Sequence, residues 1–307
     1  MPSAYATIAP ALKLLLPRAI LTRSRGLITR AQVLTLALVL RSRQDDDAFL
    51  EYKDLVALQR KFQRTKPKDY SYEPEALRQR GAERAAEVLA VVPDDNARPL
   101  RILELGCGDG MTLAALNNGQ RNLVGLDHEG DRFDQRARDL GVHFVEGDAS
   151  ATPFEAESFD VIFSYNSFEH FSDPSATYAE IVRLLASGGV FLADFGPLYH
   201  SPWGLHAYDS IHIPFCQHLF RREDILQFCR QNGLKEVDYN YVNGWRPDQF
   251  RNLFQSSGTT LETFEYTERA CLHGIDLILK YPECFRRKLT ARDDALVSSI
   301  RLLQRKF

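Results

Sequence analysis

Three short apolar segments each contain an acidic residue at or near the carboxyl end. The positions of these acids predict a ligand-binding site at one edge of a β-sheet. Glu104 lies in RILEL, Asp127 ends NLVGLD, and Asp148 ends HFVEGD. If these segments are parallel strands, their carboxyl ends meet at one edge, where such sheets bind ligands. There Asp127 can accept hydrogen bonds from two ribose hydroxyls, and Asp148 from an adenine amino group beside the backbone N–H of Ala149. An acidic edge repels a pyrophosphate but suits a nucleoside that carries positive charge.

A glycine-rich turn follows the first of these segments, in ILELGCGDGMTLAAL at residues 102–116. Its glycines, Gly106, Gly108 and Gly110, allow a tight strand-to-helix turn whose backbone can approach a ligand closely. The dinucleotide fingerprint would also need a glycine at position 111, where this chain has Met111. The spacing therefore argues against a nicotinamide-dependent oxidoreductase.

Four histidines lie six residues apart in YHSPWGLHAYDSIHIPFCQH, residues 199–218. A spacing of six scatters side chains around a helix, and Pro202 and Pro214 interrupt any long regular element, so we expect no metal site here. A histidine of ordinary pKa is instead a natural general base. The candidate bases are His200, His206 and His212, together with His170 of the motif FEH, which we expect mainly to shape the cleft.

The elements that must position these residues follow from the apolar pattern. The runs at 101–105, 122–127, 143–148, 159–164 and 189–195 are short, apolar and partly β-branched, as expected for strands buried between helical layers. We predict a doubly wound α/β fold with further strands at 260–268 and in the closing segment 294–307. Helical spacing is expected in 45–68, 75–91, 223–231 and 243–258, and a strand or extended piece at 236–241.

From about Leu100 to Phe195 the sequence resembles the class I S-adenosylmethionine-dependent methyltransferases that act on small molecules, lipids and sugars. The matching motifs are ELGCGDG, LD, GDA, FDVIFSYNSFEHFSDP and EIVRLLASGGVFLADF. The resemblance implies a mostly parallel seven-stranded Rossmann-like sheet, with an antiparallel final strand in 294–307, and S-adenosylmethionine as cofactor. It also implies that the cofactor is bound by Glu104, Gly106, Gly108, Gly110, Asp127, Asp148, Ala149, Tyr165 and Asn166.

We divide the chain into a helical extension at 1–70 and a methyltransferase domain at 71–307, in which 197–245 forms a lid over the site. In relatives the region after the fifth strand commonly covers the substrate. Here it contains aromatic residues that suit a polyhydroxylated acceptor, with one ring face stacked and hydroxyls hydrogen-bonded. The predicted substrate residues are Tyr199, Trp203, Tyr208 and Trp245.

Composition narrows the choice of partners. With a net charge of −3 and 26% charged residues, the chain lacks the basic balance of a nucleic-acid binder. Residues 1–44 nevertheless carry seven Lys or Arg and no acid. This basic segment is read as helices packing on the main domain or on a second subunit of a homodimer, as a peripheral membrane contact, or as a transit peptide. Five cysteines without a C-x-x-C pair indicate a reducing, cytoplasmic location.

The predicted reaction is O-methylation of a sugar, glycan or similar hydroxylated small molecule, with a lid histidine as the general base. A hydroxyl is a poor nucleophile at neutral pH, and a base assists it. One alternative is methylation of a quinone-like or other lipid at a membrane surface. Another is a non-catalytic homologue that binds the nucleoside as a regulator.

Overall fold

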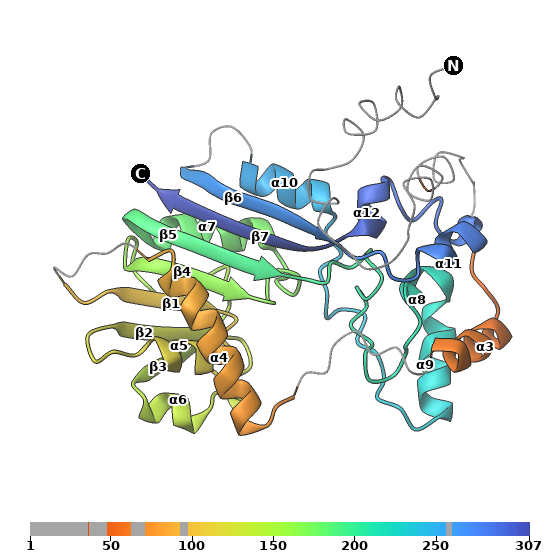
Figure 1. Cartoon of the computed structure of the whole chain (residues 1–307), viewed down its shortest axis with the longest axis horizontal. Coiled ribbons are helices and arrows are strands. Elements are labelled where there is room, and N and C mark those ends of the chain that lie inside the picture. The colour runs from red at the N-terminus through yellow and green to blue at the C-terminus, as the bar shows by residue number, and fades with distance from the viewer. Residues whose placement is uncertain (1–35, 37–47, 63–70, 93–97, 256–259) are drawn as a thin grey trace, which may run out of the picture.

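The computed structural model describes Leu36 and residues 48–62, 71–92, 98–255 and 260–307. They build a seven-stranded sheet in the order β3-β2-β1-β4-β5-β7-β6 (Figure 1). The strands are β1 (Arg101–Leu105), β2 (Asn122–Asp127), β3 (Val142–Glu146), β4 (Phe159–Tyr165), β5 (Leu185–Phe195), β6 (Leu261–Ala270) and β7 (Val297–Lys306). The first five pair in parallel, and β7 runs antiparallel to both β5 and β6. The predicted doubly wound sheet and its antiparallel closing strand are confirmed.

Helices cover both faces of this sheet. On one face lie α4 (Pro74–Leu89), α5 (Met111–Leu116) and α6 (Gln135–Asp139), whose apolar residues share a core with β1, β3 and β4. On the other lie α7 (Pro174–Leu184) and α10 (Pro247–Gln255). The helix α7 begins where the sequence favours it: Pro174 is at its first position, and Asp173 Oδ1 accepts a hydrogen bond from the N–H of Ala176 at 2.9 Å.

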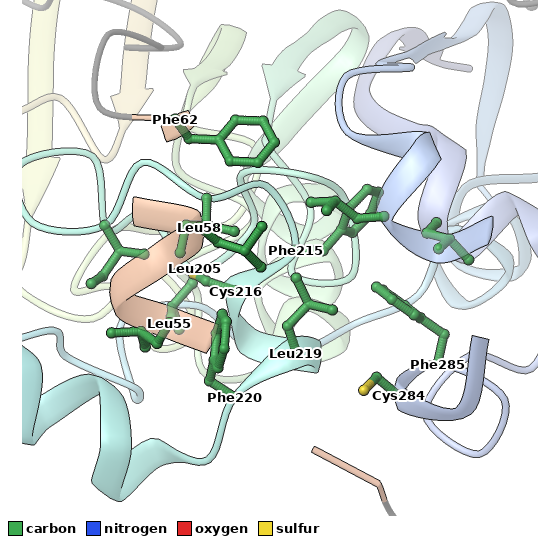
Figure 2. Packing of buried hydrophobic residues seen from close by; sticks show 14 of the residues in the cluster. Leu55, Leu58, Phe62, Leu205, Phe215, Cys216, Leu219, Phe220, Cys284 and Phe285 are labelled. Carbon is green, nitrogen blue, oxygen red and sulfur yellow. The ribbon is translucent and has the colours of Figure 1, made fainter. Parts of the chain in front are cut away.

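Besides one core on each face of the sheet, a third hydrophobic core lies beside the ends of the strands. It joins α3 (Tyr52–Phe62), α8 (Cys216–Leu219), α9 (Arg222–Gln231), α11 (Ile275–Lys280) and the 3-10 helix η3 (Pro282–Cys284), which we call the helical unit. Figure 2 shows Leu55 and Leu58 of α3 packed with Phe220 and Leu219. In Figure 1 the arrowheads of β4 and β5 point toward this unit, so it stands next to the end of the sheet where ligands are expected.

The helical unit corrects part of the sequence-based description. Residues 236–241 form no strand, although their polar and apolar residues alternate, because no neighbouring strand pairs with them. Residues 270–289, to which the sequence pattern gives no secondary structure, contain α11 and η3. The predicted closing strand at 294–307 begins too early, because α12 (Arg292–Leu296) occupies its first residues and β7 starts at Val297. The basic segment predicted to pack as helices or to touch a membrane is residues 1–44. Of this segment the structure describes only Leu36, so the prediction lies outside the described residues. No helix within the described ranges is both long and apolar enough to cross a membrane.

Candidate active site at the carboxyl edge of the sheet

The glycine turn joins β1 to α5 and has little free space around it. Gly106, Gly108 and Gly110 adopt φ values of 70°, 52° and 73°, in the left-handed region that favours glycine. A Cβ on Gly106 would lie 2.2 Å from Ser167 Oγ, so a larger residue does not fit. Ser167 Oγ also donates a hydrogen bond to the carbonyl of Gly106 at 3.2 Å. The turn is therefore fixed against the segment that follows β4.

Asp127 ends β2 and supports the same turn from beneath. Its side chain is only 4% exposed, and Oδ2 accepts a hydrogen bond from the N–H of Gly108 at 2.8 Å. Oδ1 accepts from the N–H of Glu129 at 3.1 Å. Because each carboxylate oxygen can accept more than one hydrogen bond, Asp127 keeps acceptor capacity for a ligand.

Glu104 lies buried in β1 below the turn. One of its oxygens, Oε2, has no hydrogen-bond partner among the residues that the structure describes. Burial raises the pKa of Glu104 well above its usual value, and Arg84 opposes this effect. A buried acid with an unused oxygen can accept a donor or a cationic group from a ligand.

The remaining predicted cofactor residues lie along the same edge. Asp148 Oδ1 accepts hydrogen bonds from the N–H and the hydroxyl of Ser150, both at 2.8 Å, and Ala149 is buried. At the end of β4, the Tyr165 hydroxyl contacts Glu87 Oε2 at 3.2 Å. Asn166 has a φ of 51°, and its N–H donates to the carbonyl of Asp194 at 2.9 Å. All nine residues therefore lie on or beside the ends of β1 to β4, which we call the carboxyl edge.

Arg132 was not predicted from the sequence, yet it lies over the glycine turn. Arg132 Nη2 lies 3.3 Å from where a Cβ on Gly108 would be. Its Nη1 forms an ion pair with Glu129 Oε2, also at 3.3 Å. Burial would lower the pKa of Arg132, but the carboxylates of Asp127 and Glu129 outweigh this and raise it. Arg132 therefore keeps a positive charge beside the carboxylates of this edge.

The structure divides the four evenly spaced histidines into separate environments. His200 stacks on His218 at 5.2 Å between ring centroids, and burial lowers the pKa of His200 to about 4. The backbone N–H of His212 donates to Gln59 of α3 at 3.0 Å. Among the three candidate bases of the lid, His206 is the one whose ring contacts His170, at 4.9 Å between centroids.

His206 and His170 belong to an aromatic group that also contains Tyr208 and Tyr241. His170 Nδ1 lies 2.6 Å from the carbonyl oxygen of Tyr241, and the Asn243 side chain donates to the carbonyls of Phe168, the first residue of the FEH motif, and of Phe171, which follows the motif. We call His170, His206, Tyr208 and Tyr241 the imidazole cluster. It connects the end of β4 with two segments that are distant in sequence.

The other predicted substrate residues lie outside this cluster. Trp203 packs near His273, with 5.1 Å between ring centroids, and Tyr199 packs near His200 at the same distance. Trp245 packs on Phe250 of α10, also at 5.1 Å. Tyr208 is therefore the one of the four whose ring meets the imidazole cluster.

A family comparison bears directly on this edge, since residues 103–193 match the model described as "Methyltransferase domain". The chain carries a class I S-adenosylmethionine-dependent methyltransferase domain. The match begins in β1 and ends in β5, so it includes the glycine turn, Asp127 and the FEH motif. S-adenosylmethionine is the cofactor of such domains.

Individual relatives of this methyltransferase domain match over part of their length. A rice (Oryza sativa subsp. japonica) 2-methyl-6-phytyl-1,4-hydroquinone methyltransferase is 27% identical over 46% of this chain and 40% of its own. An uncharacterized methyltransferase of Bacillus subtilis is 32% identical over 52% of this chain and 66% of its own. Among solved structures, an S-adenosylmethionine-dependent methyltransferase from Mesorhizobium loti shares 18% identity and a TM-score of 0.43, covering 73% of this chain and 98% of its own. The chain thus spans less than half of the first of these relatives.

Proposed function

We propose that the chain transfers the methyl group of S-adenosylmethionine to an oxygen of a hydroxylated acceptor. The observation that carries this proposal is the position of the imidazole cluster. Ser167, which contacts Gly106, lies only three residues before His170, so the cluster stands beside the glycine turn. An acceptor held by the cluster would therefore lie close to a cofactor bound at the turn.

The residues of the carboxyl edge fit a cationic nucleoside. The buried Glu104 oxygen without a partner and the acidic surroundings suit the ammonium and sulfonium groups, and Asp127 retains capacity for ribose hydroxyls. Asp148 with Ala149 would hold the adenine, while Tyr165 and Asn166 would border the methionine end. The bound cofactor supplies an electrophilic methyl group on a positively charged sulfur.

The chain's own task is then to align the acceptor oxygen with that methyl group and to exclude water. The turn after β4 fixes the acceptor side, because Asn243 and Tyr241 bind its backbone and His170. The helical unit, which includes α8 and α9 of the predicted lid, would shield the site from water.

A lid histidine as general base is part of this proposal, and His206 is its best-placed candidate. His206 Nε2 lies 2.9 Å from the carbonyl oxygen of Pro197, so Nε2–H donates and Nδ1 is left to accept a proton. Burial, and secondarily His170, lower the pKa of His206 to about 3. Such a group is a weak base at neutral pH, so a more acidic hydroxyl would be methylated more readily.

This weak base favours a second candidate acceptor besides a sugar or glycan. A phenolic hydroxyl ionises with a pKa of about 10 in the reference case of tyrosine, far more readily than an alcohol. The rice relative is named for a phytyl hydroquinone, a molecule that carries phenolic hydroxyls. We therefore propose hydroquinones as the alternative acceptor. Because such an acceptor would be a lipid, this alternative includes a peripheral membrane contact through residues 1–44. A cytoplasmic location and a homodimer stay predictions.

Titration calorimetry followed by a product assay tests the proposal. We expect S-adenosylmethionine to bind and NAD not to bind. Methylated product, detected by mass spectrometry, should then form from a panel of monosaccharides, oligosaccharides, prenylated hydroquinones and catechols. Methylation of amines or carboxylates alone would refute the O-methylation proposal. Tight cofactor binding without turnover on any class of acceptor would favour the non-catalytic homologue instead.

A further inference from the structure

Three potential metal ligands converge at the carboxyl edge. One ligand atom each from Glu169, His170 and His206 lies within 4.8 Å of the others. Glu169 and His170 follow β4, whereas His206 comes from the segment after β5. The sequence-based expectation of no metal considered spacing among the lid histidines and did not pair one of them with the FEH motif.

The hydrogen bonds of both histidines prepare them to bind a cation. His170 Nδ1 is 2.6 Å from the carbonyl of Tyr241, and His206 Nε2 is 2.9 Å from the carbonyl of Pro197. Since a carbonyl can only accept, each of these nitrogens carries the proton, and the other nitrogen of each neutral ring presents a lone pair. Metal-binding histidines in proteins are oriented by bonds of this kind.

Glu169 supplies a charge for such a cation. The side chain is 1% exposed, and Oε1 accepts a hydrogen bond from the N–H of Gly196 at 3.0 Å. Oε2 is buried and has no partner within the described parts of the chain. A buried carboxylate oxygen without a donor is costly, and a bound cation would compensate it.

The backbone of His206 is strained in a way that a binding role would explain. Its φ of 54° lies in the left-handed region, which residues other than glycine rarely adopt. A hydrogen bond from its N–H to the carbonyl of Trp203 at 3.0 Å maintains this conformation. Conformations of this kind cost about 1–3 kcal/mol and cluster at functional sites.

We infer that Glu169, His170 and His206 bind a divalent first-row transition-metal ion whose remaining positions receive acceptor oxygens. Two imidazoles and one carboxylate suit zinc, iron or nickel better than magnesium or calcium, which prefer oxygen ligands. Metal–ligand bonds of about 2.1 Å place neighbouring ligand atoms about 3–4 Å apart. The Glu169 oxygen that lies 3.8 Å from His170 Nε2 is Oε1, which also accepts from Gly196, so a modest side-chain rotation would be needed to bring the partnerless Oε2 to the ion.

This ion would deepen the proposed function, on which the acceptor part of the inference rests. A bound cation lowers the pKa of a coordinated hydroxyl. With its free nitrogen on the ion, His206 would act as a ligand and not as the base, and the ion would take over the activation of the hydroxyl. The hydroxyl proton would pass to water, the oxygen would form a bond to the methyl carbon, and the carbon–sulfur bond would break with its electron pair left on sulfur. The acceptor class is one with two neighbouring oxygens that can chelate, such as a vicinal diol or a catechol.

The test titrates the full chain, freed of metal by chelator, with Co²⁺ and follows visible absorption and heat. We expect one ion per chain with a micromolar or tighter Kd. Glu169→Gln and His206→Asn should each raise that Kd by about 100-fold, while His143→Gln, an exposed histidine on β3, should not change it. Absence of stoichiometric binding by the folded wild-type chain overturns the inference whatever the variants do. Equal binding by all variants also overturns it.

Two further arms separate this inference from the proposed function. Added 4-nitrocatechol should change the cobalt spectrum of the wild-type chain and not that of His206→Asn; no change overturns the acceptor part. Titration with S-adenosylmethionine is run in parallel on the metal-free chain. Cobalt binding without cofactor binding upholds the metal site and refutes the proposed function. Cofactor binding and turnover that survive complete removal of metal refute the catalytic use of the ion and leave the proposed function intact.

Discussion

Replacing Asp127 with asparagine is the most direct test of the carboxyl edge. The substitution keeps the shape of the side chain but removes its charge and turns one oxygen into an N–H₂ donor. Because the two oxygens accept from Gly108 at 2.8 Å and Glu129 at 3.1 Å, one of these backbone donors would then face another donor. The ribose hydroxyls would also lose a charged acceptor.

The magnitude follows from these bonds. A hydrogen bond to a charged group contributes about 1.5–3 kcal/mol. Weakening the two bonds from the ribose hydroxyls to Asp127 therefore costs about 3 kcal/mol of binding free energy, or about a hundredfold in Kd. The matched control is Asp131→Asn, which removes the same charge from an exposed side chain in the next turn of chain, the 3-10 helix η2 (Gly130–Arg132). We expect that control to change Kd less than threefold, because solvent screens an exposed charge.

Calorimetric titration with S-adenosylmethionine and with S-adenosylhomocysteine measures both variants, and circular dichroism checks that each is folded. Both ligands contain the same ribose, so Asp127→Asn should weaken them by similar factors. A Kd for folded Asp127→Asn within threefold of the wild-type value would refute the ribose assignment. An equal loss in Asp131→Asn would show a general charge effect instead.

Three further predictions concern the same site and its surroundings. Gly106→Ala should abolish cofactor binding, because its Cβ would lie 2.2 Å from Ser167 Oγ at a φ of 70°; Gly106→Ala with Ser167→Gly should recover part of it by calorimetry, and no recovery would contradict the steric explanation. Arg132→Gln should raise the affinity for cationic S-adenosylmethionine relative to neutral S-adenosylhomocysteine by about threefold, since it removes a positive charge near Asp127 in a solvent-screened position; an unchanged ratio would count against that reasoning. Since burial lowers the pKa of His200 to about 4, the unfolded state binds its proton first, and stability should fall by up to about 3 kcal/mol as the pH drops from 6.5 to 4. His200→Gln should flatten this dependence in urea unfolding, and an unaltered pH slope would contradict the assignment.

The sequence predicted where the residues of the carboxyl edge lie because each of them belongs to the end of a strand or to the turn that follows it. The glycine turn and Asp127 each follow a recognisable strand, and a parallel sheet brings strand ends together without further information. The closing strand β7 was predicted from its mixed alternation together with the resemblance, which implies an antiparallel final strand. These features depend on short-range pattern and on topology.

The remaining parts depend on contacts between distant segments, which periodicity does not reveal. Nothing in the even spacing of the four histidines indicates that His206 would meet His170 while His200 would stack on His218. Likewise, the alternation in 236–241 predicts two faces but not a pairing partner, and there the chain instead supplies the Tyr241 carbonyl to His170. The helical unit draws on α3, α8, α9 and α11, so no single window of sequence contains its core.

The position of β7 has a consequence for how the protein is made. β7 is the last strand in the sequence, yet it lies between β5 and β6 and supplies the only ladder that β6 has within the described sheet. During synthesis from the amino terminus, β5 therefore remains an open edge until residues 297–306 have emerged. Such an edge, bordered by the buried Phe191 and Phe195, is a template for pairing with other chains. Nascent or truncated chains should thus depend on chaperones far more than the finished protein does.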